Sequence, residues 1–231
     1  MVSGPPRSWA NHQKVPQLGE FQSLADGLTN IDRRAYLDCG KDPRMPVLGL
    51  GPRDARICIM GRDPGKQEAC AGRPFIGAAG QKIRPILREY FDRGAAVDAA
   101  QEPTEDAHVF WLGTVPYKPL GNKAWPERVR RSFHPLLRDL LLDEWDGVNV
   151  ITLGTQAFEW FSIDQHEEEI QRLRQFWSRG ERYEESTSVL LRGTHRSREF
   201  HLHPLPHPSP ANALWYSKFA DLMQSRLRSI L

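Results

Sequence analysis

The chain has 231 residues, 39% of them hydrophobic, which is enough for one substantial core. Its 31 Lys and Arg residues nearly balance 29 Asp and Glu residues, and a formal net charge of +2 does not by itself indicate a nucleic-acid partner. The sequence shows no signal-peptide run and no stretch near the ~20 apolar residues of a membrane helix. We therefore expect a soluble, cytoplasmic protein with no membrane partner, built as a single domain over 1–231 with 1–16 as a loose, Pro-rich lead-in.

The cysteines argue against a metal site. The chain has three, Cys39, Cys58 and Cys70, and none of them forms a close CxxC pair. This predicts neither a disulfide framework nor a tetrathiolate site. Cys58 lies in a short apolar stretch and is expected to be a buried strand residue.

Short apolar stretches alternate with helical patterns along the chain. The elements expected in chain order are a helix over 21–37, a strand over 56–60, a helix over 81–91, a strand over 109–112, a helix over 126–142, a strand over 148–153, helices over 156–161 and 167–177, strands over 189–192 and 200–203, and a closing helix over 212–231. Strands that alternate with helices predict a largely parallel sheet covered on both faces.

Two proline-bearing loops carry the residues most suited to chemistry. Gly61-Arg62-Asp63-Pro64-Gly65 follows the first strand, and His207-Pro208-Ser209-Pro210 follows the last. Asp63 would thus lie just beyond the carboxyl end of a strand, where open α/β sheets bind ligands. Taken singly, a turn aspartate and a hydrogen-bonded loop histidine would explain the same residues.

Basic residues gather in two places, at 128–131 and at 192–198, while 167–169 is an acidic run. Such clusters are typical of solvated faces as much as of nucleic-acid contacts.

Four segments in order resemble the uracil-DNA glycosylase superfamily. The Gly61-to-Gly65 loop resembles its first motif, and the run Gly72-Arg73-Pro74-Phe75-Ile76-Gly77-Ala78-Ala79-Gly80 is similar to one found in its iron–sulfur branch. The segment 113–122 resembles the strand-end segment of that branch, and His207-Pro208-Ser209-Pro210 resembles the second motif of the superfamily. The resemblance implies a single α/β domain with a mainly parallel, four-stranded sheet flanked by helices.

The resemblance also implies roles for these residues. Breaking an N-glycosidic bond leaves a cationic sugar and an anionic base, so negative charge is needed near the sugar and a donor near the base oxygen. Asp63 would orient the attacking water and stabilise the sugar cation, and a neutral His207 would donate to the uracil O2. Phe75 would stack on the extruded base, backbone N–H groups near Arg62 would add to the oxyanion stabilisation, and Ser209 belongs to the second motif.

The sequence departs from these relatives at several positions. The iron–sulfur branch has four cysteine ligands, and only Cys39 lies near an expected position, so we expect no cluster and no other cofactor. Gly65 stands where related enzymes carry a thymine-excluding Tyr, and Gly113 replaces the Asn that reads the uracil edge. Thr114, backbone groups or Asn122 remain to take over that reading.

A further departure lies just after the second motif, where Ala211 stands in place of a Leu that wedges into the duplex. A methyl group cannot fill the gap that a flipped base leaves. This predicts a preference for single-stranded or mismatched uracil.

The sequence therefore predicts a monomeric, monofunctional uracil-DNA glycosylase that acts on uracil-containing DNA, close to the nucleoid if the source is bacterial. Related deaminated bases are expected substrates as well. The alternative from another class is a uracil-DNA binding or covalently trapping protein without turnover. A general nucleotide-binding or hydrolase domain is a weaker alternative, since the chain has neither a Walker-type loop nor a Gly-x-Ser-x-Gly elbow.

Overall fold

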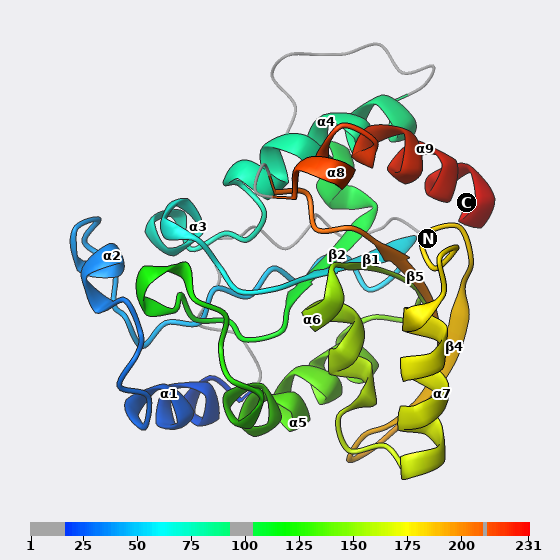
Figure 1. Cartoon of the computed structure of the whole chain (residues 1–231). Helices are drawn as coiled ribbons and strands as arrows, with labels where there is room; N and C mark the ends of the chain where they lie inside the picture. Colours follow the sequence, from blue (N-terminus) through cyan, green and yellow to red (C-terminus); the bar gives the residue numbers. More distant parts are fainter. Residues whose placement is uncertain (1–16, 93–103, 210–211) are drawn as a thin grey trace, which may run out of the picture.

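The computed structural model describes residues 17–92, 104–209 and 212–231. A five-stranded sheet with strand order β2-β1-β3-β5-β4 runs through its centre (Figure 1). The strands are β1 (Ile57–Gly61), β2 (Val109–Gly113), β3 (Asn149–Leu153), β4 (Thr187–Arg192) and β5 (Ser197–Leu205). β1 pairs in parallel with β2 and β3, and β3 pairs in parallel with β5, so these four strands end at one edge of the sheet.

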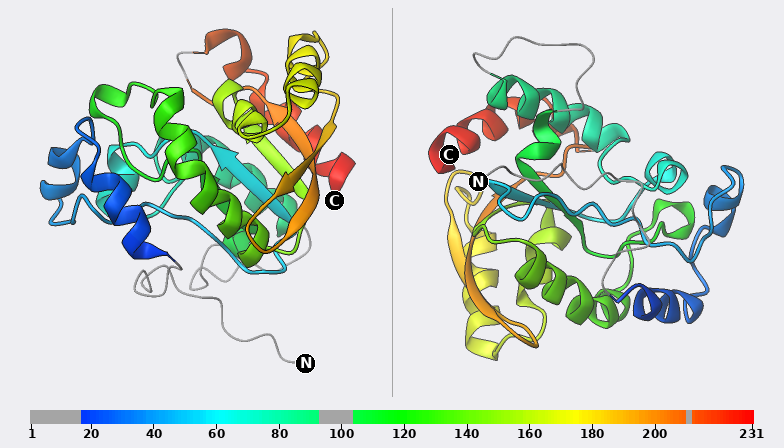
Figure 2. Two further views of the ribbon diagram at one scale, coloured as in Figure 1. Left: turned by 90° about the horizontal axis from the view of Figure 1, so that it is seen from below. Right: turned by 180° about the vertical axis from the view of Figure 1, so that it is seen from behind.

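Helices cover both faces of the sheet (Figures 1 and 2). The α-helices are α1 (Leu18–Asp26), α2 (Arg33–Leu37), α3 (Lys66–Ala71), α4 (Ala78–Phe91), α5 (Glu127–Glu144), α6 (Thr155–Glu159), α7 (Glu167–Ser178), α8 (Ala213–Tyr216) and α9 (Phe219–Ile230). Short 3-10 turns are η2 (Thr104–Ala107), η3 (Leu120–Asn122) and η4 (Trp160–Ser162). Among the described residues, none of these helices has the length and apolar character needed to cross a bilayer.

The α/β prediction is confirmed and the five strands expected along the chain are present, but the four-stranded sheet that the resemblance implied is one strand short. The four parallel strands correspond to the expected sheet, and β4 adds a fifth that pairs antiparallel with β5. On β4, Val189 and Leu191 are buried while Leu190 is exposed. This alternation is typical of an antiparallel edge strand with one covered face.

Two hydrophobic clusters fill the space on either side of the sheet. Ile57 and Ile59 of β1 pack with residues of α4 and α9, whereas Cys58 and Met60 face the cluster that includes α1, α5 and α7. The alternation follows from the two-residue period of a strand. Cys58 is fully buried, as expected.

The first and last predicted helices are each broken in two. The expected helix over 21–37 ends at Asp26, and α2 begins again after Asp32, whose carboxylate accepts a hydrogen bond from the Ala35 backbone N–H. A side-chain cap of this kind starts a new helix rather than continuing an old one. The closing helix is interrupted between Tyr216 and Phe219, so that none of the α8 residues is buried while Phe219 starts the buried face of α9.

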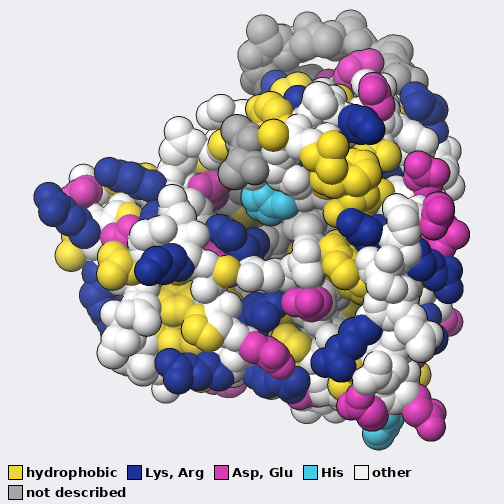
Figure 3. All heavy atoms as spheres, viewed as in Figure 1, with side chains coloured by type: hydrophobic (Ala, Val, Ile, Leu, Met, Phe, Trp, Pro, Cys, Tyr) yellow, Lys and Arg dark blue, Asp and Glu magenta, His cyan; other side chains and the backbone are white. Residues whose placement is uncertain are grey.

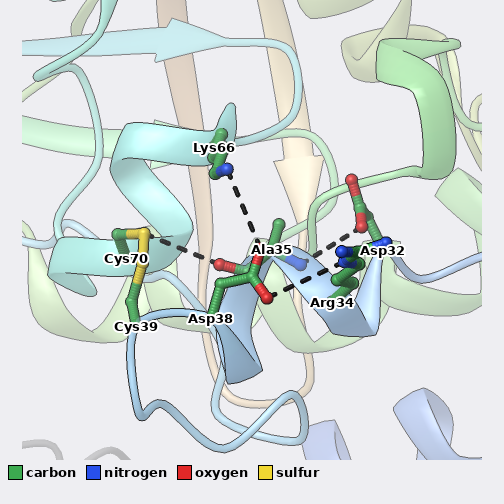
Figure 4. The surroundings of a disulfide bond; sticks show 7 residues. All are labelled: Asp32, Arg34, Ala35, Asp38, Cys39, Lys66 and Cys70. Carbon is green, nitrogen blue, oxygen red and sulfur yellow. Dashed lines mark hydrogen bonds and ion pairs between the residues drawn. A yellow bond between two sulfur atoms is a disulfide. The ribbon is translucent and has the colours of Figure 1, made fainter.

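The cysteine spacing predicted no disulfide framework, and the structure contains one disulfide that this spacing did not indicate. α2 and α3 pack side by side, which brings the Cα atoms of Cys39 and Cys70 within 5.3 Å and joins the two side chains in a disulfide (Figure 4). The two residues are 31 positions apart. A local spacing pattern cannot reveal such a pair, because it depends on how two helices pack.

Candidate active site

The carboxyl ends of four parallel strands contribute the loops of one pocket. Asp63 follows β1, Thr114 follows β2, Gly154 follows β3 and His207 follows β5. This edge of an open α/β sheet is where ligands bind. The pocket is lined by Val47, Gly61, Arg62, Asp63, Pro64, Glu68, Pro74, Phe75, Ala79, Gly113, Leu153 and His207.

The Asp63 carboxylate lies at the base of its loop and is almost fully enclosed, with a side chain only 1% exposed. Its Oδ1 accepts a hydrogen bond from the Thr114 hydroxyl at 3.2 Å, and its Oδ2 lies 3.4 Å from the Trp125 backbone N–H that donates to it. Burial raises the pKa of Asp63 to about 6, and the charge of Arg62 is the largest influence acting against that rise. At neutral pH the Asp63 side chain is therefore mainly ionised. Its pKa lies close enough to neutral pH for the carboxylate to accept a proton during a reaction.

His207 lines the same pocket and is neutral. Burial and the nearby Arg62 charge lower its pKa to about 4. Its backbone is fixed by its own loop, because the His207 carbonyl accepts hydrogen bonds from the Ser209 N–H at 2.8 Å and the Asn212 amide at 3.4 Å. Gly154, with φ of +83°, lies so close that an added Cβ would be 3.0 Å from the His207 Cβ. A neutral imidazole in this place can donate one N–H.

Arg62 connects the two groups electrostatically. Its Nε lies 3.7 Å from the Asp63 carboxylate, and its Nη2 donates to the Asn122 carbonyl at 3.2 Å. The positive charge favours the ionised form of Asp63 and the neutral form of His207. One cation thus favours an ionised Asp63 and a neutral His207 at the same time.

Phe75 forms a wall of the pocket in a backbone conformation with φ of +55°. Its ring lies against Gly61, where an added Cβ would come 2.6 Å from the Phe75 Cζ, and its centroid is 5.0 Å from that of Trp111. The Phe75 carbonyl accepts a hydrogen bond from Arg84 Nε at 2.7 Å. The ring is consequently held in one place, as a stacking surface needs to be.

The structure does not bring all of the predicted site residues into the pocket. Five of them line it: Arg62, Asp63, Phe75, Gly113 and His207. Gly65 lies in the sequence between the lining residues Pro64 and Glu68. Thr114 is buried behind Asp63, while Ser209 lies in the His207 loop.

Asn122 is exposed and meets Arg62 through its backbone carbonyl. An added Cβ at Gly113 would come 2.8 Å from the Arg62 carbonyl oxygen, so this backbone has no room for the Asn of related enzymes. Pro210 and Ala211 lie outside the described residues.

Sequence reasoning missed Glu68, which is buried and lines the pocket. Its two carboxylate oxygens accept hydrogen bonds from the Gly65 N–H at 3.1 Å and the Gly77 N–H at 2.7 Å. Glu68 therefore ties the first motif to the run that carries Phe75. The signal was present, since a Glu three residues into a helix frequently bonds back to the residue before its first turn.

Replacing Glu68 with Gln should lower the free energy of unfolding by about 1–3 kcal/mol, because an amide offers one acceptor oxygen where two backbone N–H groups need one each. Thermal or urea unfolding measures this. Glu168→Gln, an exposed acid on α7, is the matched control and should leave stability unchanged. Equal stability of both variants would show that the two bonds to Glu68 contribute nothing.

The rate of a reaction that uses the Asp63 carboxylate should rise with pH around a midpoint near 6, because Asp63 is protonated below that value and ionised above it. His207 is already neutral across that range and adds no second rise. Arg62→Gln removes a charge that favours the carboxylate, so its midpoint should move to higher pH. Lys66→Gln, which removes an exposed charge from α3, should not move it. A rate that is flat from pH 5 to 8 would contradict the role of Asp63.

The residues of the chain do not fit an iron–sulfur cluster. Such clusters take four cysteine thiolates, whereas the chain has three cysteines, two joined to each other and the third fully buried in β1. Across the described ranges, no group of three or more His, Cys, Asp or Glu side chains is placed to hold a metal ion.

The fold and the site together define an α/β domain with a ligand pocket at the carboxyl edge of its parallel strands, lined by an enclosed acid and a neutral histidine. Residues 48–230 match the family model of the uracil DNA glycosylase superfamily, and the chain belongs to that superfamily.

Two relatives carry the name type-4 uracil-DNA glycosylase. The one from Thermotoga maritima is 31% identical over 116 residues, which cover 50% of this chain and 53% of the relative. The one from Archaeoglobus fulgidus is 34% identical over 67 residues, or 29% of this chain and 34% of the relative. The matched part thus spans about half or less of either relative's length.

Proposed function

We propose that this protein is a uracil-DNA glycosylase that takes uracil out of the base stack and hydrolyses its N-glycosidic bond. The observation that carries the proposal is the pairing of a buried Asp63 with a neutral His207 in one pocket walled by the Phe75 ring. The family and the two relatives named for this activity support it.

In the proposed reaction the bond between the sugar C1′ and the base nitrogen N1 breaks, and its electron pair leaves with the base. His207 donates a hydrogen bond to the uracil O2 as negative charge develops there. Asp63 stabilises the cationic sugar and orients a water, whose oxygen bonds to C1′ while its proton passes to the carboxylate. The products are an abasic site and the uracil anion, which takes up a proton from solvent on release, while Asp63 returns the proton of the attacking water to solvent.

Burial of Asp63 serves this chemistry because protein groups, and not bulk solvent, surround the charge. A carboxylate without solvent screening interacts more strongly with the sugar cation. The hydrogen bonds from Thr114 and Trp125 hold its oxygens in place before the substrate arrives.

The alternative is a protein that binds or covalently traps uracil-DNA without turnover. An excess of uracil-containing oligonucleotide over protein distinguishes the two. A glycosylase should convert many equivalents to alkali-labile abasic sites, whereas a trapping protein should yield at most one equivalent of an adduct that survives SDS electrophoresis. If neither abasic sites nor an adduct formed, the protein could only be a binding protein.

We expect a base range wider than uracil, because Gly65 leaves open the place of an aromatic gate. Wild-type protein should release 5-hydroxymethyluracil, hypoxanthine or xanthine as well as uracil. An added Cβ at Gly65 would lie 2.7 Å from the Glu68 carboxylate, so Gly65→Tyr can narrow the range only if Glu68 moves. Base-release assays on a panel of modified oligonucleotides test this. If the wild type releases only uracil, the lack of an aromatic ring at Gly65 does not widen the range of accepted bases.

We expect the protein to act on DNA as a monomer in the cytoplasm, near the nucleoid if the source is bacterial. We also expect a preference for single-stranded or mismatched uracil, because the small Ala211 side chain cannot fill the gap left by a flipped base and such uracils need little energy to unstack.

A further inference from the structure

The short helix α8 presents an aromatic pair outside the core. Trp215 and Tyr216 are both partly exposed, no residue of α8 is buried, and the neighbouring Leu214 is 68% exposed. Large aromatic side chains usually end up in the core or at an interface. Figure 3 shows hydrophobic side chains gathered over α8, with Lys and Arg side chains next to them.

Cations accompany each exposed ring. The Lys82 Nζ lies 4.4 Å from the centre of the Tyr216 ring, and the Lys218 Nζ lies 5.6 Å from that of Trp215. Tyr183 meets Trp215 edge to face at 4.8 Å and itself lies under Arg182, whose Cζ is 4.7 Å from the ring centre. We call these residues, Lys82, Arg182, Tyr183, Trp215, Tyr216 and Lys218, the aromatic platform.

The aromatic platform lies directly beside the pocket. α8 follows the His207 loop, and Asn212 connects the two, since its amide donates to the His207 carbonyl while its own carbonyl accepts from the Trp215 and Tyr216 N–H groups. From the other side, Ala79 lines the pocket and Lys82 follows it by one turn of α4. A strand whose uracil enters the pocket would therefore pass over these rings.

We propose that the aromatic platform binds the single-stranded DNA that flanks the target uracil, with Trp215 and Tyr216 stacking on neighbouring bases and Lys82 and Lys218 facing phosphates. Rings interleaved with cations are the usual means of holding single strands without sequence preference. Glu185 is paired with Arg179 at 2.9 Å, while the exposed Glu181 and Glu184 flank Arg182, so the cations available to a DNA backbone are Lys82 and Lys218 beside the two exposed rings. The inference rests on the proposed function for its choice of substrate.

Affinity for a uracil-free, single-stranded oligonucleotide, measured by fluorescence anisotropy, tests the platform separately from excision. Trp215→Ala should weaken binding about tenfold, and Trp215→Phe should restore most of it because a ring remains. Leu190→Ala, an exposed apolar residue on β4, is the matched control and should bind like wild type. A strand of the same length made of abasic residues should bind wild type more weakly than the normal strand does. Because it has no bases to stack, it should bind wild type and Trp215→Ala with equal affinity.

Lys82→Ala combined with Lys218→Ala provides a second variant that leaves both rings in place. It should weaken binding and flatten the salt dependence, since fewer phosphate contacts release fewer counterions. Equal affinity of Trp215→Ala and wild type, or an equal loss on the abasic strand, would overturn the proposal. The proposal would also be overturned if the platform variants changed oligomeric state but kept the DNA affinity of wild type, because the platform would then be a protein interface. Intact platform binding without uracil release would instead refute the proposed function alone.

Discussion

Asp63→Asn should lower the single-turnover rate of uracil excision by roughly 10² or more, because it removes the negative charge that faces the sugar cation. The substitution keeps the shape of the side chain, and its oxygen can still meet the Thr114 hydroxyl. The amide group would then face the Trp125 N–H, so that one weak hydrogen bond at 3.4 Å is lost. Binding of uracil-DNA should persist, since the pocket wall and Phe75 are untouched.

Rapid-quench kinetics with enzyme in excess measure this rate, and anisotropy measures binding. Asp54→Asn, an exposed acid before β1, serves as the control and should excise like wild type. If Asp63→Asn retains a rate near that of wild type, Asp63 does not act on the reacting sugar.

His207→Ala should lower the same rate by roughly 10²–10³, the usual effect of removing one donor from a developing oxyanion. His207→Gln should recover part of the loss, because its amide can still donate. The fold should survive, since the His207 backbone carbonyl, which the substitution leaves in place, accepts the Ser209 and Asn212 hydrogen bonds that hold the loop.

His195→Ala, an exposed histidine before β5, is the matched control and should leave the rate unchanged. Full activity of His207→Ala would assign the stabilisation of the base anion to other groups, such as backbone N–H donors.

The site could be predicted where a short motif follows a strand directly. The loop with Asp63 was predictable because β1 is short, apolar and fully buried, and parallel strands place their carboxyl ends together. The loop with His207 was predictable only from its motif, because β5 is nine residues long and carries several polar side chains. The Phe75 wall followed from the resemblance, and the pocket does contain it.

Other features depend on packing that no local pattern encodes. The Cys39–Cys70 disulfide needs α2 against α3, and Glu68 acquires its two partners only when Gly77 folds back toward Gly65. The platform could not be predicted, because an amphipathic pattern continues through 212–231. The structure interrupts the helix between α8 and α9 and leaves Trp215 outside the core.

The central claim is that the pocket hydrolyses the glycosidic bond through its buried acid. The most direct measurement is the amount of free uracil released from excess single-stranded oligonucleotide, quantified by mass spectrometry for wild type and Asp63→Asn side by side. Wild type should release many equivalents of uracil per molecule, and the variant should release it at a rate at least about 10² lower. No uracil above one equivalent from wild type, or equal release by both proteins, would contradict it.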